Sequence, residues 1–183
     1  MKILRTPDEC FNNLEDYPFE PNYIDIEHNN HTLRMHYLDE NSESEEIVLL
    51  MHGEPTWSYL YRKIIPILVS NSKRVIAPDL IGFGKSDKPS AREDYSYANH
   101  VMWVETLIQK LDLKNIIFFA QDWGGLIGLR LLAKYPHLYE GLVVSNSGLP
   151  VGSGATEGFM QWLHFSQNVC LLYTSPSPRD FQV

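Results

Sequence analysis

Four short runs of mainly apolar residues recur along the chain, and none of them alternates with polar positions. They are residues 47–51, 74–77, 116–120 and 142–145. A strand that is buried on both faces reads as a continuous apolar run, because neither face meets water. The four runs therefore predict strands in the interior of one sheet.

Segments with helical spacing lie between these runs, at residues 57–69, 101–111 and 125–134. In these segments apolar residues recur three or four positions apart, which is typical of a helix with one buried face. In the first segment that stripe comprises Leu60, Ile64, Ile67 and Leu68, although Pro66 would kink the helix.

Two alternating segments precede the first apolar run, at residues 23–28 and 33–38, and Asn29 and Asn30 begin the link between them. Alternation across an Asn-rich link indicates a β-hairpin, since Asn tolerates positive φ. A hairpin followed by the order β-α-β-α-β-α-β predicts an α/β fold. We expect a mostly parallel sheet with helices on both of its faces.

Changes in composition suggest four regions. Residues 1–22 hold three prolines among aromatic residues and predict an irregular surface arm, and residues 23–148 form the α/β core. Residues 149–169 begin with a Gly- and Ser-rich stretch and resume an amphipathic pattern at 159–167. Residues 170–183 have no place in the scheme, and four strands after the hairpin leave the sheet unfinished.

Composition and charge narrow the classes of protein that fit. The 183 residues are 44% hydrophobic and 21% charged, close to the average of globular proteins. The 15 basic and 23 acidic residues give a net charge of −8, which argues against a nucleic-acid or anionic-membrane partner. Two cysteines cannot form a disulfide framework, and no signal peptide or spanning segment is evident. We expect a cytoplasmic protein.

The clearest chemical motif is Gln121-Asp122-Trp123-Gly124-Gly125, where a predicted buried strand passes directly into a predicted helix. Ala120 and Gly124 flank Asp122 two positions away on each side. Small residues at those positions are what a strained strand-to-helix turn needs, and such a turn lifts its central side chain out of the sheet. Asp122 is therefore a candidate nucleophile, with a plain helix N-cap as the alternative.

A second motif, His52-Gly53-Glu54-Pro55, directly follows the first apolar run. In the nucleophile-elbow fold this loop supplies one N–H of an oxyanion hole, and the residue after the nucleophile supplies the other. Those donors are expected to be the backbone N–H groups of Glu54 and Trp123. An ordinary β-to-α turn is the alternative.

Three stretches together resemble the haloalkane dehalogenases of the α/β-hydrolase superfamily, and they fall in that family's order. They are HGEPTWSYLYR at 52–62, APDLIGFGKSDKP at 77–89 and QDWGG at 121–125. The resemblance covers residues 20–168 and implies an eight-stranded sheet with a helical cap inserted after the sixth strand. It also implies hydrolysis of a haloalkane by water to an alcohol, a halide ion and a proton, without metal or organic cofactor.

The residue type at the turn agrees with this chemistry, because a carboxylate suits displacement at a saturated carbon. Asp122 would form an alkyl ester, which a His-activated water would then hydrolyse. By resemblance, the indole N–H of Trp123 is the first halide donor. The position that holds Asn in other subgroups is Glu54 here, so Trp162 at the start of the cap is expected as the second donor. Core packing is the alternative for Trp162, and Trp57 and Trp103 are expected to be packing residues.

Several family features are not found in the sequence. Asn146 follows the sixth strand, so the acid that orients the catalytic His should come after the seventh strand, as in the subgroup with a cap Trp. None of the seven histidines follows a late core strand, which predicts a chain cut inside the cap. Residues 170–180 resemble the translation of a transposase-type sequencing adapter, so we expect 170–183 to be foreign to the fold.

The sequence also allows two functions other than that of a haloalkane dehalogenase. An epoxide hydrolase shares the aspartate at the turn, but its His-Gly loop usually carries an apolar aromatic residue where Glu54 stands. The other alternative is a protein without catalytic activity, either a ligand-binding relative or an inactive fragment. Paired tyrosines in the cap would favour the epoxide hydrolase.

Overall fold

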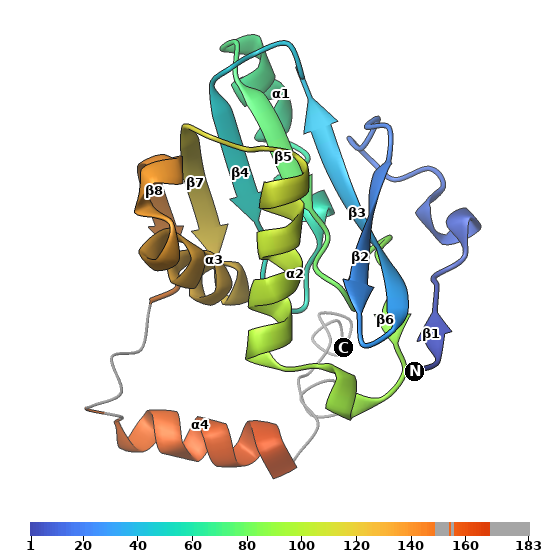
Figure 1. The fold of residues 1–183 in the computed structure, drawn as a ribbon, viewed down its shortest axis with the longest axis vertical. Helices are drawn as coiled ribbons and strands as arrows, with labels where there is room; N and C mark the ends of the chain where they lie inside the picture. The colour runs from blue at the N-terminus through green and yellow to red at the C-terminus, as the bar shows by residue number, and fades with distance from the viewer. Residues whose placement is uncertain (149–153, 155, 169–183) are drawn as a thin grey trace, which may run out of the picture. The chain divides into compact units, whose positions relative to one another are not determined.

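The computed structural model describes residues 1–148, 154 and 156–168 (Figure 1). The chain divides into two units, Met1–Leu149 and Pro150–Val183. The first unit contains the sheet and both of the chemical motifs. Among the described residues, no helix has the length and apolarity needed to cross a bilayer.

A six-stranded sheet in the order β2-β3-β5-β4-β7-β8 forms the centre of the first unit. The strands are β2 (Asn22–His28), β3 (His31–Glu40), β4 (Ile47–Met51), β5 (Arg74–Pro78), β7 (Ile116–Gln121) and β8 (Tyr139–Ser145). β5, β4, β7 and β8 run parallel, whereas β2 and β3 form an antiparallel hairpin that joins the sheet through β5. All five residues of β4 are buried, as its unbroken apolar run predicts. The predicted α/β fold is confirmed.

The turn of the β2–β3 hairpin is tighter than the sequence suggested. Only Asn29 and Asn30 separate the strands, and their φ values are 48° and 60°. Two successive residues with positive φ match the twist of the paired strands, and Asn accepts that conformation more readily than most residues. The strands consequently extend to His28 and from His31.

Helices cover both faces of the sheet (Figure 1). On one face, Ile108 of α2 (Tyr97–Lys110) and Ile127 of α3 (Trp123–Lys134) pack in a core that also contains Leu49 of β4. On the other face, Ile65 of α1 (Ile65–Ser70) packs in a core that contains Leu50. Successive residues of one strand thus enter opposite cores, which is the geometry of a strand between two helical layers.

The single helix expected over residues 57–69 is wrong. The structure has a short 3-10 helix, η2 (Ser58–Tyr61), and then α1, with Pro66 in its first turn. Proline fits a first turn because its missing N–H has no partner there, whereas inside a longer helix it would remove a hydrogen bond. The predicted apolar stripe is also misplaced, since Ile67 is 60% exposed while Ile65 is fully buried.

The N-terminal arm is more ordered than its composition indicated. Its strand β1 (Ile3–Leu4) pairs with β6 (Lys88–Pro89), and η1 (Asp8–Phe11) follows. Arg5 also forms a bidentate ion pair with the buried Asp87. The arm is therefore attached to the loop between β5 and α2.

The remaining short elements are η3 (Arg92–Asp94) and η4 (Pro136–Leu138) in the first unit. The second unit contains α4 (Glu157–Asn168), where the amphipathic pattern at 159–167 predicted a helix. The expected foreign segment, residues 170–183, lies outside the described residues.

Candidate active site

Asp122 lies at the sharp turn between β7 and α3. Its φ of 54° and ψ of −126° place it outside the regions that non-glycine residues ordinarily occupy. A backbone of this kind persists only where the surrounding structure enforces it, and such strain clusters at functional sites. The structure thus forms the predicted strained turn, although Asp122 makes no side-chain capping bond to its own helix.

The glycines around Asp122 leave no room for a side chain. A Cβ on Gly124 would collide with the carbonyl oxygens of Met51 and His52, and one on Gly53 would collide with the Asp122 carboxylate. On the other side, the Ser147 hydroxyl donates a 2.7 Å hydrogen bond to the Asp122 carbonyl. The small residues that the sequence motif contains are therefore required by close backbone contacts.

The His-Gly loop reaches the Asp122 carboxylate directly. The backbone N–H of Glu54 donates a hydrogen bond of 2.9 Å to Asp122 Oδ1. Trp123 is the first residue of α3, so its N–H has no acceptor within its own helix. The two backbone donors that the sequence predicted thus belong to the loop and the helix start that flank this carboxylate.

His52 is fully buried below the loop, and both nitrogens of its ring are engaged. Nε2 accepts the N–H of Leu80 at 2.9 Å, so Nδ1 carries the proton and donates to the Gly53 carbonyl at 2.9 Å. Burial lowers the pKa of His52, and the nearby carboxylates of Asp79 and Asp122 oppose this only in part. The ring therefore acts as a neutral connector between two loops.

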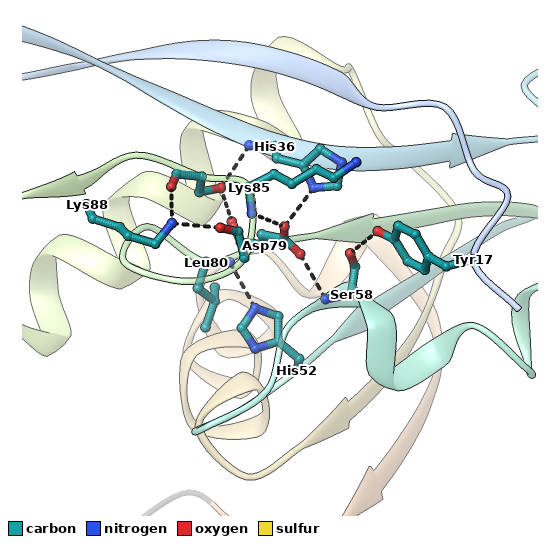
Figure 2. A network of polar contacts seen from close by, with 10 residues as sticks. Tyr17, His36, His52, Ser58, Asp79, Leu80, Lys85 and Lys88 are labelled. Carbon is teal, nitrogen blue, oxygen red and sulfur yellow. Dashed lines mark hydrogen bonds and ion pairs between the residues drawn. The ribbon is translucent and has the colours of Figure 1, made fainter. Parts of the chain in front are cut away.

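A buried carboxylate, Asp79, links the strand ends behind the His-Gly loop (Figure 2). It accepts hydrogen bonds of 2.8 Å from His36 Nδ1, from the N–H of Ser58 and from the N–H of Lys85. Burial alone would raise the pKa of Asp79, but the hydrogen bond and charge of His36 hold it below its ordinary value. Figure 2 shows the carboxylate between β3, the start of η2 and the loop after β5, with Tyr17 of the arm bonded to Ser58.

Roles for the side chains of His52, Asp79 and His36 were not predicted from the sequence. The position of Asp79 directly after a buried apolar strand was a usable signal. A buried carboxylate needs hydrogen-bond donors, because burying it without a partner is costly. No comparable signal exists for His36, which lies in the alternating pattern of a hairpin strand.

The predicted halide donors fall in different units. The Trp123 side chain is 36% exposed at the start of α3. Trp162 lies in α4, and its side chain is outside the described residues. The pairing of the two indoles therefore stays a prediction.

Two other residues considered in the sequence lie in the first unit. Asn146, after β8, accepts a hydrogen bond from the Ser145 hydroxyl. Trp103 is fully buried, as expected for a packing residue.

No metal centre is formed by the described residues, since they contain no group of three or more potential ligands. A hollow of about 170 Å³ lies between α2, α3 and η4, and its wall is mainly apolar. It is lined by Glu105, Ile108, Gln109, Leu131, Tyr135, His137 and Leu138. Leu131 and Tyr135 mark the end of α3 remote from Asp122, so this hollow is separate from the turn.

Comparison with known proteins agrees with the geometry of the turn. A family model described as the alpha/beta hydrolase fold matches residues 46–169. The chain belongs to this family. Within the alpha/beta hydrolase fold family, it is 53% identical over 171 residues to a haloalkane dehalogenase of Psychrobacter cryohalolentis, and 51% identical over 169 residues to one of Mycolicibacterium paratuberculosis. The match covers 92% and 91% of this chain, respectively, but 56% of each relative. The chain thus spans a little over half the length of these curated alpha/beta hydrolases.

Solved structures of two alpha/beta hydrolases differ in how closely they match this chain. The haloalkane dehalogenase DpaA from Paraglaciecola agarilytica superposes with a TM-score of 0.85 at 43% identity, covering 93% of this chain and 57% of DpaA. An epoxide hydrolase from Vigna radiata reaches 0.64 at 28% identity, covering 79% of this chain and 46% of the epoxide hydrolase. The predicted resemblance to haloalkane dehalogenases is confirmed, and epoxide hydrolases are more distant.

Proposed function

We propose that this chain carries the nucleophilic half of a haloalkane dehalogenase. The observation that supports the proposal best is the Asp122 carboxylate at a strained turn, with Oδ1 held by the Glu54 N–H at 2.9 Å. A carboxylate held at one oxygen presents its other oxygen to a substrate in a defined direction. The high identity to haloalkane dehalogenases of two bacteria favours this chemistry over acyl transfer.

In the first step, Oδ2 of Asp122 attacks the carbon that bears the halogen. A carbon–oxygen bond forms, the carbon–halogen bond breaks, and its electron pair leaves with the halide ion. No proton moves in this step. The indole N–H groups of Trp123 and Trp162 are the proposed donors to the departing halide, since an indole N–H donates and offers no lone pair that would repel an anion.

In the second step, a water molecule attacks the carbonyl carbon of the alkyl ester. Negative charge then develops on the carbonyl oxygen of the ester, Oδ1, which the Glu54 N–H holds. The Trp123 N–H is the proposed second donor, and the two donors would stabilise the tetrahedral intermediate. The intermediate collapses to alcohol and Asp122, and a base takes the proton from the water. His52 of the His-Gly loop is engaged at both nitrogens. The chain is therefore proposed to support the first step alone.

Incubation of the purified chain with a small bromoalkane, followed by mass spectrometry and peptide mapping, tests this function. We expect one alkyl group on Asp122, released bromide in equal amount, and no sustained formation of alcohol. Asp122→Asn should form no adduct, because a neutral amide is a much weaker nucleophile than a carboxylate.

Three results would count against the proposal. Alkylation at another residue with Asp122 unmodified would reject this nucleophile. Repeated turnover would mean that some base in the chain activates water. A reaction with a small epoxide but none with the bromoalkane would favour the epoxide hydrolase.

A further inference from the structure

The peptide group between Gly53 and Glu54 is held on both of its sides. Its carbonyl oxygen accepts three hydrogen bonds, from His52 Nδ1 at 2.9 Å, from the Thr56 N–H at 3.0 Å and from Thr56 Oγ1 at 2.9 Å. Its N–H donates to Asp122 Oδ1 at 2.9 Å. A single peptide plane thus connects the His52 ring to the candidate nucleophile.

The planarity of the peptide bond makes this connection directional. In a trans peptide the C=O and N–H point in opposite directions within one plane, so fixing the oxygen fixes the hydrogen. Gly53 permits the close approach, because any Cβ there would collide with the Asp122 carboxylate. Three donors on the oxygen therefore set the direction in which the Glu54 N–H points.

Which nitrogen of the His52 ring carries the proton is decided by the hydrogen bond at Nε2. Leu80 offers an N–H to Nε2, and both His52 and Leu80 are buried, so the ring keeps its proton on Nδ1. In the other tautomer, Nδ1 and the Gly53 carbonyl would be two acceptors facing each other, and two donors would face each other at Leu80. The loop after β5 thereby selects the tautomer that donates to Gly53.

We infer that His52 is a positioning residue for the proposed reaction: with Thr56, it aligns the Gly53–Glu54 peptide so that the Glu54 N–H holds Asp122 Oδ1. The inference rests on the proposed function. His52 touches neither substrate nor the reacting atoms, and its effect passes through one peptide group. A residue that only tethered the two loops would act equally through either nitrogen.

Two substitutions separate these roles. In His52→Asn the amide nitrogen takes the place of Nδ1, so the bond to the Gly53 carbonyl is retained and the bond from Leu80 is lost. In His52→Gln the amide takes the place of Nε2, so its oxygen accepts from Leu80 and the donor to Gly53 is lost. Positioning predicts that the Gln variant is the more impaired, whereas tethering alone predicts that the two variants are impaired equally.

The first measurement follows the Glu54 amide by NMR in the ¹⁵N-labelled chain, with the β2–β3 hairpin signals as the check on folding. His52→Gln should speed hydrogen exchange at Glu54 about tenfold or more and shift its signal as Asp122→Asn does, because the same bond is weakened. His52→Asn should stay close to the parent. An unchanged Glu54 amide in a folded His52→Gln chain overturns the inference.

The second measurement is the rate of Asp122 alkylation by the bromoalkane. We expect about a tenfold loss in His52→Gln and less than about a threefold loss in His52→Asn, since small misplacements of a reacting group cost rate steeply. Equal losses in both variants overturn the inference. If His52→Gln does not fold, Thr56→Val removes one donor from the same carbonyl and should give a smaller change of the same sign, and no change overturns the inference.

The two proposals can fail separately. If the Glu54 amide responds as expected but the parent chain forms no adduct, the alignment of the peptide is supported and the dehalogenase chemistry is rejected. If Asp122 is alkylated at the parent rate in the His52 and Thr56 variants, the chemistry is supported and the positioning role is rejected.

Discussion

Replacing Asp79 with Asn should destabilise the first unit more than most single substitutions in it. The carboxylate is fully buried and accepts three hydrogen bonds of 2.8 Å, two of them at Oδ2. An amide keeps most of these bonds by placing its oxygen at the Oδ2 position, where it can still accept from His36 and Lys85. Its NH₂ then faces the Ser58 N–H, which leaves two buried donors without an acceptor.

The expected loss in the free energy of unfolding follows from these two unpaired donors and the two bonds that remain. Each buried donor without a partner costs about 1–3 kcal/mol, and the two bonds that survive lose their charge assistance. Together these effects give about 3–5 kcal/mol, which is a large part of the 5–15 kcal/mol that stabilises an ordinary domain. With a urea m-value of about 2 kcal/mol/M, the unfolding midpoint should fall by about 1.5–2.5 M.

Urea unfolding followed by tryptophan fluorescence and circular dichroism measures the change. Asp112→Asn is the matched control, because Asp112 forms an exposed ion pair with Lys114 and has a positive φ that Asn tolerates. That variant should lose less than about 1 kcal/mol. A loss of less than about 1 kcal/mol for Asp79→Asn at pH 7 would refute the reasoning.

The pH dependence gives a second check on Asp79. Its pKa is lowered in the folded chain, so its contribution to stability is present above the unfolded-state pKa of about 4. That contribution is lost as the pH falls through the folded-state pKa. The difference between parent and Asp79→Asn should therefore be largest near neutral pH and shrink below about pH 4. A difference that grows on acidification would contradict this assignment.

Two further predictions concern the halide and the packing of α3. Trp162→Phe should weaken halide binding about 10- to 100-fold in a fluorescence titration, because one charge-assisted bond of about 1.5–3 kcal/mol is lost, while Trp57→Phe should leave it unchanged. Gly128→Ala should destabilise the chain by about 1–3 kcal/mol in urea unfolding, because its Cβ would strike the buried Phe118 ring. Gly158→Ala, which has open space in α4, should cost nothing. Equal effects of the two substitutions in either pair would contradict the prediction.

The sequence predicted those features that determine the residue types of one short segment. A strand buried on both faces has to be apolar throughout, so β4 could be found from five residues. The turn at Asp122 could be found because Gly124 faces backbone carbonyls that no side chain could pass. In both cases the constraint acts on residues that are neighbours in the chain.

Features that depend on distant residues and do not restrict the local residue types were missed. The pairing of β1 with β6 joins segments more than 80 residues apart through two residue pairs, which is too short for any periodicity. The direction of the Glu54 N–H depends on His52, whose ring is fixed by the backbone of Leu80. A backbone donor leaves no trace in residue type, so this contact could not be read from the sequence.

The outer strand β8 exposes apolar side chains on both faces of the sheet. Among the described residues it pairs with β7 alone, and its Leu142 and Val143 are 47% and 48% exposed. Successive residues of a strand point to opposite faces, so apolar surface is uncovered above and below the sheet at once. A single strand paired with this edge would satisfy the backbone groups of β8 but leave the side chains of Leu142 and Val143 exposed to solvent. Covering this edge therefore requires apolar contacts on both faces of the sheet as well as partners for the strand backbone.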